Sequence, residues 1–253
     1  MPDGASGTPA AKTEYRDLPI IDLGQFLKGG GNEPGTLPEE IRHACENIGF
    51  FFIVNHGVSE DLLKRIFEQT EAFHDLPLDA KTALNINMNQ RGYIAPKATM
   101  VRHSTYNENN KFDTNATMVF ATEYPEDNPH RQAGKWFYDG NQWPDGLPGF
   151  TETVREYMAT LTSLGKSMLP LWARALDLEP GFFDPYFENN YTYFRMAHYP
   201  PVPDLEANEF GLGPHADTGF MTFLPQADVD GLEILDVDGK WFRPPQMHDA
   251  ILV

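Results

Sequence analysis

Residues 211–226, which read GLGPHADTGFMTFLPQ, decide how this chain is interpreted. The sharpest feature of this stretch is a histidine followed two residues later by an aspartate, His215 and Asp217. Side chains two residues apart on a strand point to the same face, so this imidazole and carboxylate can reach one metal ion together. Two histidines and one carboxylate on one face of an octahedron suit Fe(II) and oxygen chemistry. The pair alone is a weak signal, because the same pattern also occurs as a surface pair or a hydrogen-bonded core pair.

Composition narrows the class of protein. The 253 residues include 37 acidic and 19 basic side chains, a formal net charge of −18. Binding along a nucleic-acid backbone needs clustered Lys and Arg, so this charge argues against a nucleic-acid partner. The one cysteine, Cys45, cannot form an intramolecular disulfide or a thiolate cluster. The longest apolar run, residues 50–54, is too short to span a membrane, and no signal-peptide pattern precedes it. We therefore expect a soluble, cytoplasmic globular protein whose partner is a small molecule. The oligomeric state stays open.

The order of predicted elements indicates an α+β chain with a mainly β core. Residues 1–17 are predicted to be a flexible tail, and residues 18–253 a single domain. That domain has a helix-rich part at 18–185 and a strand-rich part at 186–253. Helices are predicted at 37–49, from Ser59 to just before Pro77, and at 151–176. Strands are predicted at 18–23, 50–54, 117–121, 191–199, 219–224, 232–235, 241–243 and 250–253. Helices followed by consecutive strands favour a β-sandwich or jelly roll buttressed by helices.

Residues 211–226 resemble the iron-binding segment of the iron(II)/2-oxoglutarate-dependent dioxygenase superfamily, in its isopenicillin N synthase-like branch. That segment has His-x-Asp-x-Gly, then Thr three residues on, and then Gln. The matching residues here are His215, Asp217, Gly219, Thr222 and Gln226. Further pieces that resemble the family occur in the family's order at 19–23, 49–57, 141–150, 195–200, 231–232 and Trp241. One such piece would be weak, but the ordered set is a strong resemblance.

This resemblance implies a double-stranded β-helix, or jelly roll, with Fe(II) at one mouth. It implies that His215 and Asp217 are iron ligands and that Tyr199 hydrogen-bonds the carboxylate of 2-oxoglutarate. A phenol is a neutral donor suited to that role, although a tyrosine packed in a sheet is an equal alternative. The implied enzyme is an oxidoreductase that uses Fe(II), 2-oxoglutarate and O₂ and releases succinate and CO₂. It oxidises a C–H bond of a small molecule, most often by hydroxylation, with desaturation and ring closure left open.

The chain departs from the family at its end. It stops at Val253, before the second histidine ligand and the Arg-x-Ser clamp for 2-oxoglutarate that the family needs. We therefore predict a chain truncated at its C-terminus, with the apolar residues 250–253 as an unpaired strand edge. Such a chain would hold iron weakly and could be inactive. The histidines that match no family ligand are His56, His103, His198 and His248.

The residues that contact the substrate are the hardest to predict from the sequence. The resemblance places Arg91 and Tyr93 near the pocket, and Phe220 follows the metal motif. The loop residues Arg102, His103 and Tyr106 are further candidates, and an exposed loop is the alternative for all of them. Two other functions stay open: a related oxidase that uses iron without 2-oxoglutarate, and a metal-free jelly-roll binding protein. A hydrolase is disfavoured, because the chain has no Gly-x-Ser-x-Gly motif.

Overall fold

The computed structural model describes residues 13–101, 104, 106, 110–203, 206 and 208–253. The chain forms two compact units, each assembled from separate stretches of sequence. Unit 1 holds the described residues of 64–158 and 190–216, and unit 2 holds those of 13–63, 159–189 and 217–253. This division is not the one at residue 185 that the sequence indicated, because each unit takes residues from both parts of the chain. A single domain over 18–253 stays a prediction.

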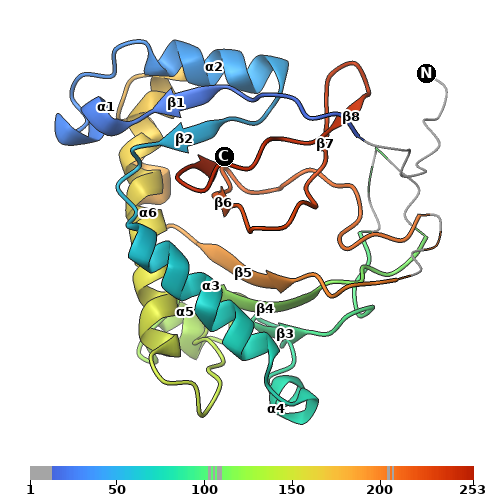
Figure 1. The fold of residues 1–253 in the computed structure, drawn as a ribbon. Coiled ribbons are helices and arrows are strands. Elements are labelled where there is room, and N and C mark those ends of the chain that lie inside the picture. Colours follow the sequence, from blue (N-terminus) through green and yellow to red (C-terminus); the bar gives the residue numbers. More distant parts are fainter. Residues whose placement is uncertain (1–12, 102–103, 105, 107–109, 204–205, 207) are drawn as a thin grey trace. The chain divides into compact units, whose positions relative to one another are not determined.

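Unit 1 is built on a three-stranded antiparallel sheet. Its strands lie in the order β3 (Gly92–Ile94), β4 (Ala116–Ala121) and β5 (Tyr193–His198), as Figure 1 shows. Every residue of β4 is buried, as expected for a central strand with a continuous apolar run. The sheet thus gives unit 1 a buried central strand beside which neighbouring loops can be held.

Unit 2 contains a four-stranded mixed sheet in the order β1-β2-β9-β6 and a two-stranded antiparallel sheet. The strands of the first are β1 (Ile20–Asp22), β2 (Phe52–Val54), β9 (Ile251–Leu252) and β6 (Leu224–Pro225). The second pairs β7 (Ile234–Leu235) with β8 (Trp241–Phe242). A buried apolar cluster is formed by Leu18, Phe52, Ile234, Phe242, Ala250 and Leu252. Helices with mixed sheets agree with the predicted class, and most of the predicted strands appear in shorter form.

The position of β9 corrects the prediction of an unpaired apolar edge at residues 250–253. Ile251 pairs with Ile53 of β2 on one side and with Pro225 of β6 on the other, so β9 is an inner strand (Figure 1). Both residues of β9 are buried. A strand would stay unpaired here only if its neighbours had to come from later residues. The strand instead pairs with β2, which lies almost two hundred residues earlier.

The long predicted helices are confirmed to within about two residues at most of their ends. The helices are α1 (Gly24–Lys28), α2 (Leu37–Asn47), α3 (Glu60–His74), α4 (Leu78–Thr82), α5 (Pro129–Gln132), α6 (Phe150–Ala175) and α7 (Asp184–Phe187). Ser59 begins α3 as predicted, because its hydroxyl oxygen accepts the N–H of Leu62 at 3.2 Å. In the part of the chain that the structure describes, no helix combines the length and apolarity needed to cross a bilayer.

Residues 13–17 differ from the predicted flexible tail, of which residues 1–12 lie outside the described residues. Tyr15 forms a parallel bridge with Arg243, just after β8. The Arg16 N–H donates to the Arg243 carbonyl at 3.0 Å, and the Arg16 side chain forms an ion pair with Asp236 at 2.9 Å. Backbone pairing therefore holds this segment in unit 2.

Candidate functional site

The backbone that leads to His215 in unit 1 is held against the residues that precede β4. The N–H of Thr114 donates to the carbonyl of Phe210, and the N–H of Asn115 to the carbonyl of Gly211, both at 3.0 Å. Because Thr114 and Asn115 come just before the fully buried strand β4, these bonds attach an irregular loop to the start of that strand. The loop is thereby positioned although it has no regular structure of its own.

Two further hydrogen bonds position Gly213 and His215. The buried carboxylate of Asp113 accepts the N–H of Gly213 at 2.8 Å, and the Gly213 carbonyl lies 2.9 Å from Nδ1 of His215. A carbonyl only accepts, so Nδ1 carries the proton, and Nε2 of the neutral ring carries the lone pair that a metal ion needs. Burial raises the pKa of Asp113, while the N–H donors of Gly213 and Val101 and the charges of Arg195 and His215 act to lower it.

Asp217 begins the last stretch of unit 2, and its carboxylate accepts the hydroxyl of Thr222. Residues 215–217 are irregular backbone, so the predicted strand geometry of the His215–Asp217 pair is wrong. The strand predicted at 219–224 is likewise reduced to β6. An imidazole nitrogen and a carboxylate oxygen nevertheless form a donor set that suits Fe(II). Among the described residues, no group of three or more His, Cys, Asp or Glu side chains could hold a metal ion.

Tyr199 follows β5 in unit 1 and packs closely on the same loop. A Cβ atom on Gly211 would lie 2.6 Å from the Tyr199 ring, so this approach requires glycine. Although 56% of Tyr199 is exposed, burial around its phenol raises the pKa of that group. The charge of Arg195 and the nearby side-chain amide of Asn115 act to lower it. The phenol therefore stays protonated near neutral pH and can donate.

Two buried donor atoms close to Tyr199 have no well-formed hydrogen bond within the described part of the chain. They are Nε of Arg195 and the amide nitrogen of Asn115. Another Arg195 nitrogen reaches the hydroxyl of Thr117 at 3.4 Å. A buried unpaired donor costs about 1–3 kcal/mol, so two of them together indicate a missing acceptor. Sequence reasoning missed both residues, and its only available signal was a polar residue within or beside an apolar strand.

Arg91 and Tyr93, the predicted substrate residues of unit 1, are both buried. Arg91 is 0% exposed, and its guanidinium donates to the carbonyls of Asn89, Thr122 and Phe137 at 3.0, 2.8 and 2.8 Å. Tyr93 lies in β3 and is 3% exposed. These contacts give both residues a role in holding the sheet and its loops together, in place of the predicted contact with the substrate.

Phe220, the third predicted substrate residue, lies in an aromatic cluster of unit 2. Its ring centroid is 4.9 Å from that of Phe183, 5.1 Å from Phe187 and 5.7 Å from Trp172. Phe220 is 43% exposed, so part of its ring is available to a ligand. It also lies only three residues after Asp217. Phe220 therefore remains a candidate.

The residues that match no family ligand have other surroundings. His56 is buried, and its Nδ1 accepts the N–H of Val58 at 3.2 Å. His198 stacks on His74, with ring centroids 5.1 Å apart. The loop candidates Arg102 and His103 lie outside the described residues, whereas Tyr106 is 44% exposed.

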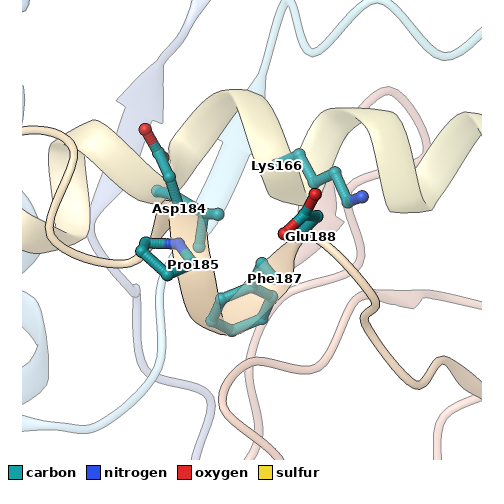
Figure 2. A pocket seen from close by; sticks show the side chains of 6 residues that line it. Lys166, Asp184, Pro185, Phe187 and Glu188 are labelled. Carbon is teal, nitrogen blue, oxygen red and sulfur yellow. The ribbon is translucent and has the colours of Figure 1, made fainter.

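A surface hollow of about 480 Å³ lies elsewhere in unit 2. Figure 2 shows its lining on α6 and around α7, which consists of Lys166, Leu169, Asp184, Pro185, Phe187 and Glu188. This lining mixes one cation with two carboxylates and includes none of the candidate site residues. The hollow therefore offers no consistent charge for a ligand and is not the site that the sequence indicates.

Comparison with known families matches two parts of the chain. Residues 18–146 match the family described as non-haem dioxygenase in morphine synthesis N-terminal, and residues 183–253 match the 2OG-Fe(II) oxygenase superfamily. The 2-oxoglutarate-Fe(II) type oxidoreductase hxnY of Emericella nidulans is 34% identical over 243 residues. That alignment covers 93% of this chain and 68% of hxnY.

Solved structures show the same likeness. The crystal structure of JOX2 in complex with 2OG, Fe and JA has a TM-score of 0.74 at 26% identity, covering 97% of this chain and 66% of that one. A full-length Neurospora crassa protein in complex with alpha-KG and thymine has a TM-score of 0.76 at 22% identity, covering 95% and 75%. At that identity, the likeness to the Neurospora crassa protein bears on the fold alone. The chain thus spans about two thirds to three quarters of the length of these relatives.

Proposed function

The chain belongs to the 2OG-Fe(II) oxygenase superfamily, and from that premise we propose how its residues hold the cofactors and what it oxidises. It is a non-haem oxygenase that uses Fe(II), 2-oxoglutarate and O₂ and acts on a small molecule. Bound iron and 2-oxoglutarate supply the oxidising chemistry, and the protein supplies binding, orientation and exclusion of water.

His215 and Asp217 bind the iron in this proposal. The observation that carries it is the hydrogen bond from His215 Nδ1 to the Gly213 carbonyl, which directs the lone pair of the ring to Nε2. The bond from Thr222 to Asp217 supports it, because it holds the carboxylate in one orientation.

Tyr199, Arg195 and Asn115 bind a carboxylate of 2-oxoglutarate in this proposal. The phenol, the buried guanidinium Nε and the buried amide are all donors, and two of them have no well-formed partner. A carboxylate would satisfy them and would gain a charge-assisted bond from Arg195. This arrangement supplies a local cation for a dianionic co-substrate.

The proposed substrate is a small molecule with an apolar face. The proposed reaction is hydroxylation, the most frequent outcome of this chemistry. Support comes from Phe220, whose partly exposed ring lies three residues after Asp217. The similar JOX2 structure also holds a further ligand, JA, together with 2OG and Fe. We further propose that the chain has the jelly-roll fold of the 2OG-Fe(II) oxygenase superfamily. A cytoplasmic location stays a prediction.

An anaerobic titration tests the iron assignment. Fe(II) and 2-oxoglutarate added to the chain should give a weak visible charge-transfer band, which His215→Ala should abolish. His43→Ala is the matched control, because His43 is an exposed histidine on α2. Absence of the band in the unaltered chain, or its survival in His215→Ala, would count against the assignment.

A further inference from the structure

Asp113 is a buried carboxylate that the proposed chemistry does not use. It is 4% exposed, and its main chain is held on both sides, since its N–H donates to Thr99 at 2.9 Å and its carbonyl accepts from Lys97 at 2.8 Å. A buried carboxylate is costly unless it is hydrogen-bonded. Among the described residues the Asp113 carboxylate forms no ion pair within 4.0 Å, and it accepts the N–H of Gly213 at 2.8 Å.

We propose that Asp113 is a positioning residue for the iron ligand His215, acting through Gly213. Two hydrogen bonds make the connection. Asp113 Oδ1 accepts the Gly213 N–H at 2.8 Å, and the Gly213 carbonyl accepts Nδ1–H of His215 at 2.9 Å. The first bond fixes the orientation of Gly213, and the second fixes the direction and the tautomer of the imidazole. This inference rests on the proposed role of His215.

The arrangement is an indirect form of a common device. Metal-binding histidines usually donate their second ring nitrogen to a carboxylate or carbonyl, and that partner sets the tautomer. Here the carbonyl belongs to a loop residue, which needs support of its own. Asp113 provides that support. It directly precedes Thr114 and Asn115, whose backbone N–H groups hold the same loop.

The first test needs no metal. Long-range ¹H–¹⁵N NMR of the metal-free chain reports the tautomer of His215, with the signal assigned from His215→Gln. We expect the Nδ1–H tautomer in the unaltered chain and in Asp113→Asn, whose amide oxygen can still accept from Gly213. Asp113→Ala should give a mixture of tautomers. Asp127→Ala, which alters an exposed aspartate of unit 1, is the control and should resemble the unaltered chain. An Nε2–H tautomer in the unaltered chain overturns the proposal, whether or not the variants fold.

The second test measures the apparent Fe(II) dissociation constant under anaerobic conditions. Loss of a residue that supports a metal ligand typically weakens metal binding by about 10–100-fold, and we expect this range for Asp113→Ala. Asp113→Asn should stay within about threefold, and Asp127→Ala should be unchanged. A merely stabilising role would lower the melting temperature of Asp113→Ala but would not move the tautomer or the dissociation constant of the folded protein. That outcome overturns the proposal.

The two tests also separate this inference from the proposed function. If His215→Ala leaves Fe(II) binding unchanged, the iron assignment fails. The tautomer measurement still decides whether Asp113 positions His215. If His215→Ala abolishes binding and Asp113→Ala changes neither readout, the iron assignment stands and the role of Asp113 is refuted.

Discussion

Gly92 begins β3 at a point where no side chain can be accommodated. Its φ is +123°, a conformation that residues with a Cβ atom rarely adopt. A Cβ atom there would lie 2.4 Å from both the Leu84 carbonyl and the amide nitrogen of Gln142, and 2.9 Å from the Asn85 carbonyl. Two of these three atoms belong to the backbone, so the clash could not be relieved by rotating a side chain.

We therefore expect Gly92→Ala to be strongly destabilising. The matched control is Gly134→Ala, because Gly134 has φ of +63° but no atom within 4 Å of the added methyl. Gly134→Ala carries only the conformational cost of about 1–2 kcal/mol. Gly92→Ala adds a backbone clash and should cost more than about 4 kcal/mol. Urea unfolding of both variants measures the difference, and equal losses would contradict this explanation.

His74 should make the stability of the chain depend on pH. It is 8% exposed, and burial lowers its pKa to about 4, with His198 and Lys81 acting in the same direction and the bond to the Met196 carbonyl opposing them. The unfolded histidine has a pKa of about 6.5. As the pH falls from about 6.5 to 4, the unfolded chain takes up a proton that folded His74 does not, so stability is lost over this window.

The effect can be isolated with His74→Gln. The unfolding free energy should fall by on the order of 3 kcal/mol between pH 7 and pH 4. No such loss is expected above the pKa of the unfolded histidine. The difference in unfolding free energy between the unaltered chain and His74→Gln should therefore shrink by about that amount over the same window. Urea unfolding at several pH values checks it, with the exposed His43→Gln as control. A difference that does not change with pH would contradict the assignment.

The site residues differ in how far the sequence could predict them. His215 and Asp217 could be found because their signal is local, two residues apart within a recognisable motif. Asp113 could not, because its contact with Gly213 joins residues one hundred positions apart. Arg91 was predicted as a substrate residue for a related reason, because an arginine near a candidate pocket suggests contact with a ligand. Only the folded chain shows its guanidinium bound to three carbonyls.

At the scale of elements, the sequence predicts the type of a segment, helix or strand, more accurately than it predicts the partner of a strand. The apolar run at the end of the chain was predicted as a strand and is β9. A continuous apolar run carries no information about its partners, so the position of β9 between β2 and β6 could not be inferred. Residues 215–217 show the opposite failure, since a motif typical of a strand lies in irregular backbone. Hydrogen bonds to the residues before β4 hold that loop instead.

The inner position of β9 makes its side chains important for stability. Ile251 is 0% exposed and lies between strands β2 and β6. Truncation of such a residue leaves a cavity, so Ile251→Ala should lower the unfolding free energy by about 2–5 kcal/mol. Val237→Ala is the control, because Val237 is 76% exposed and its truncation should change stability by less than about 0.5 kcal/mol. Similar losses for the two variants in urea unfolding would mean that β9 is not a buried central strand.

At the scale of the whole molecule, the charge acts on the two ligands in opposite directions. The chain carries a formal charge of −18, so its long-range field attracts Fe(II) and repels the 2-oxoglutarate dianion. Arg195 supplies positive charge only locally, beside Tyr199. Salt screens the long-range field, whose reach falls to about 10 Å at 0.1 M ionic strength. A contact with a single buried cation is screened much less.

Raising the salt concentration should therefore weaken Fe(II) binding and strengthen 2-oxoglutarate binding. Anaerobic titrations at about 0.01 M and 0.1 M NaCl, where the screening length falls from about 30 to 10 Å, would measure both dissociation constants. The 2-oxoglutarate titration is done at saturating Fe(II), and sucrose of equal osmolality is the control for non-ionic effects. If the dianion bound more weakly at high salt, local attraction by Arg195 would outweigh the field of the whole chain. In that case Arg195→Gln should remove most of the salt dependence, whereas a dominant long-range field predicts that the dependence survives this substitution.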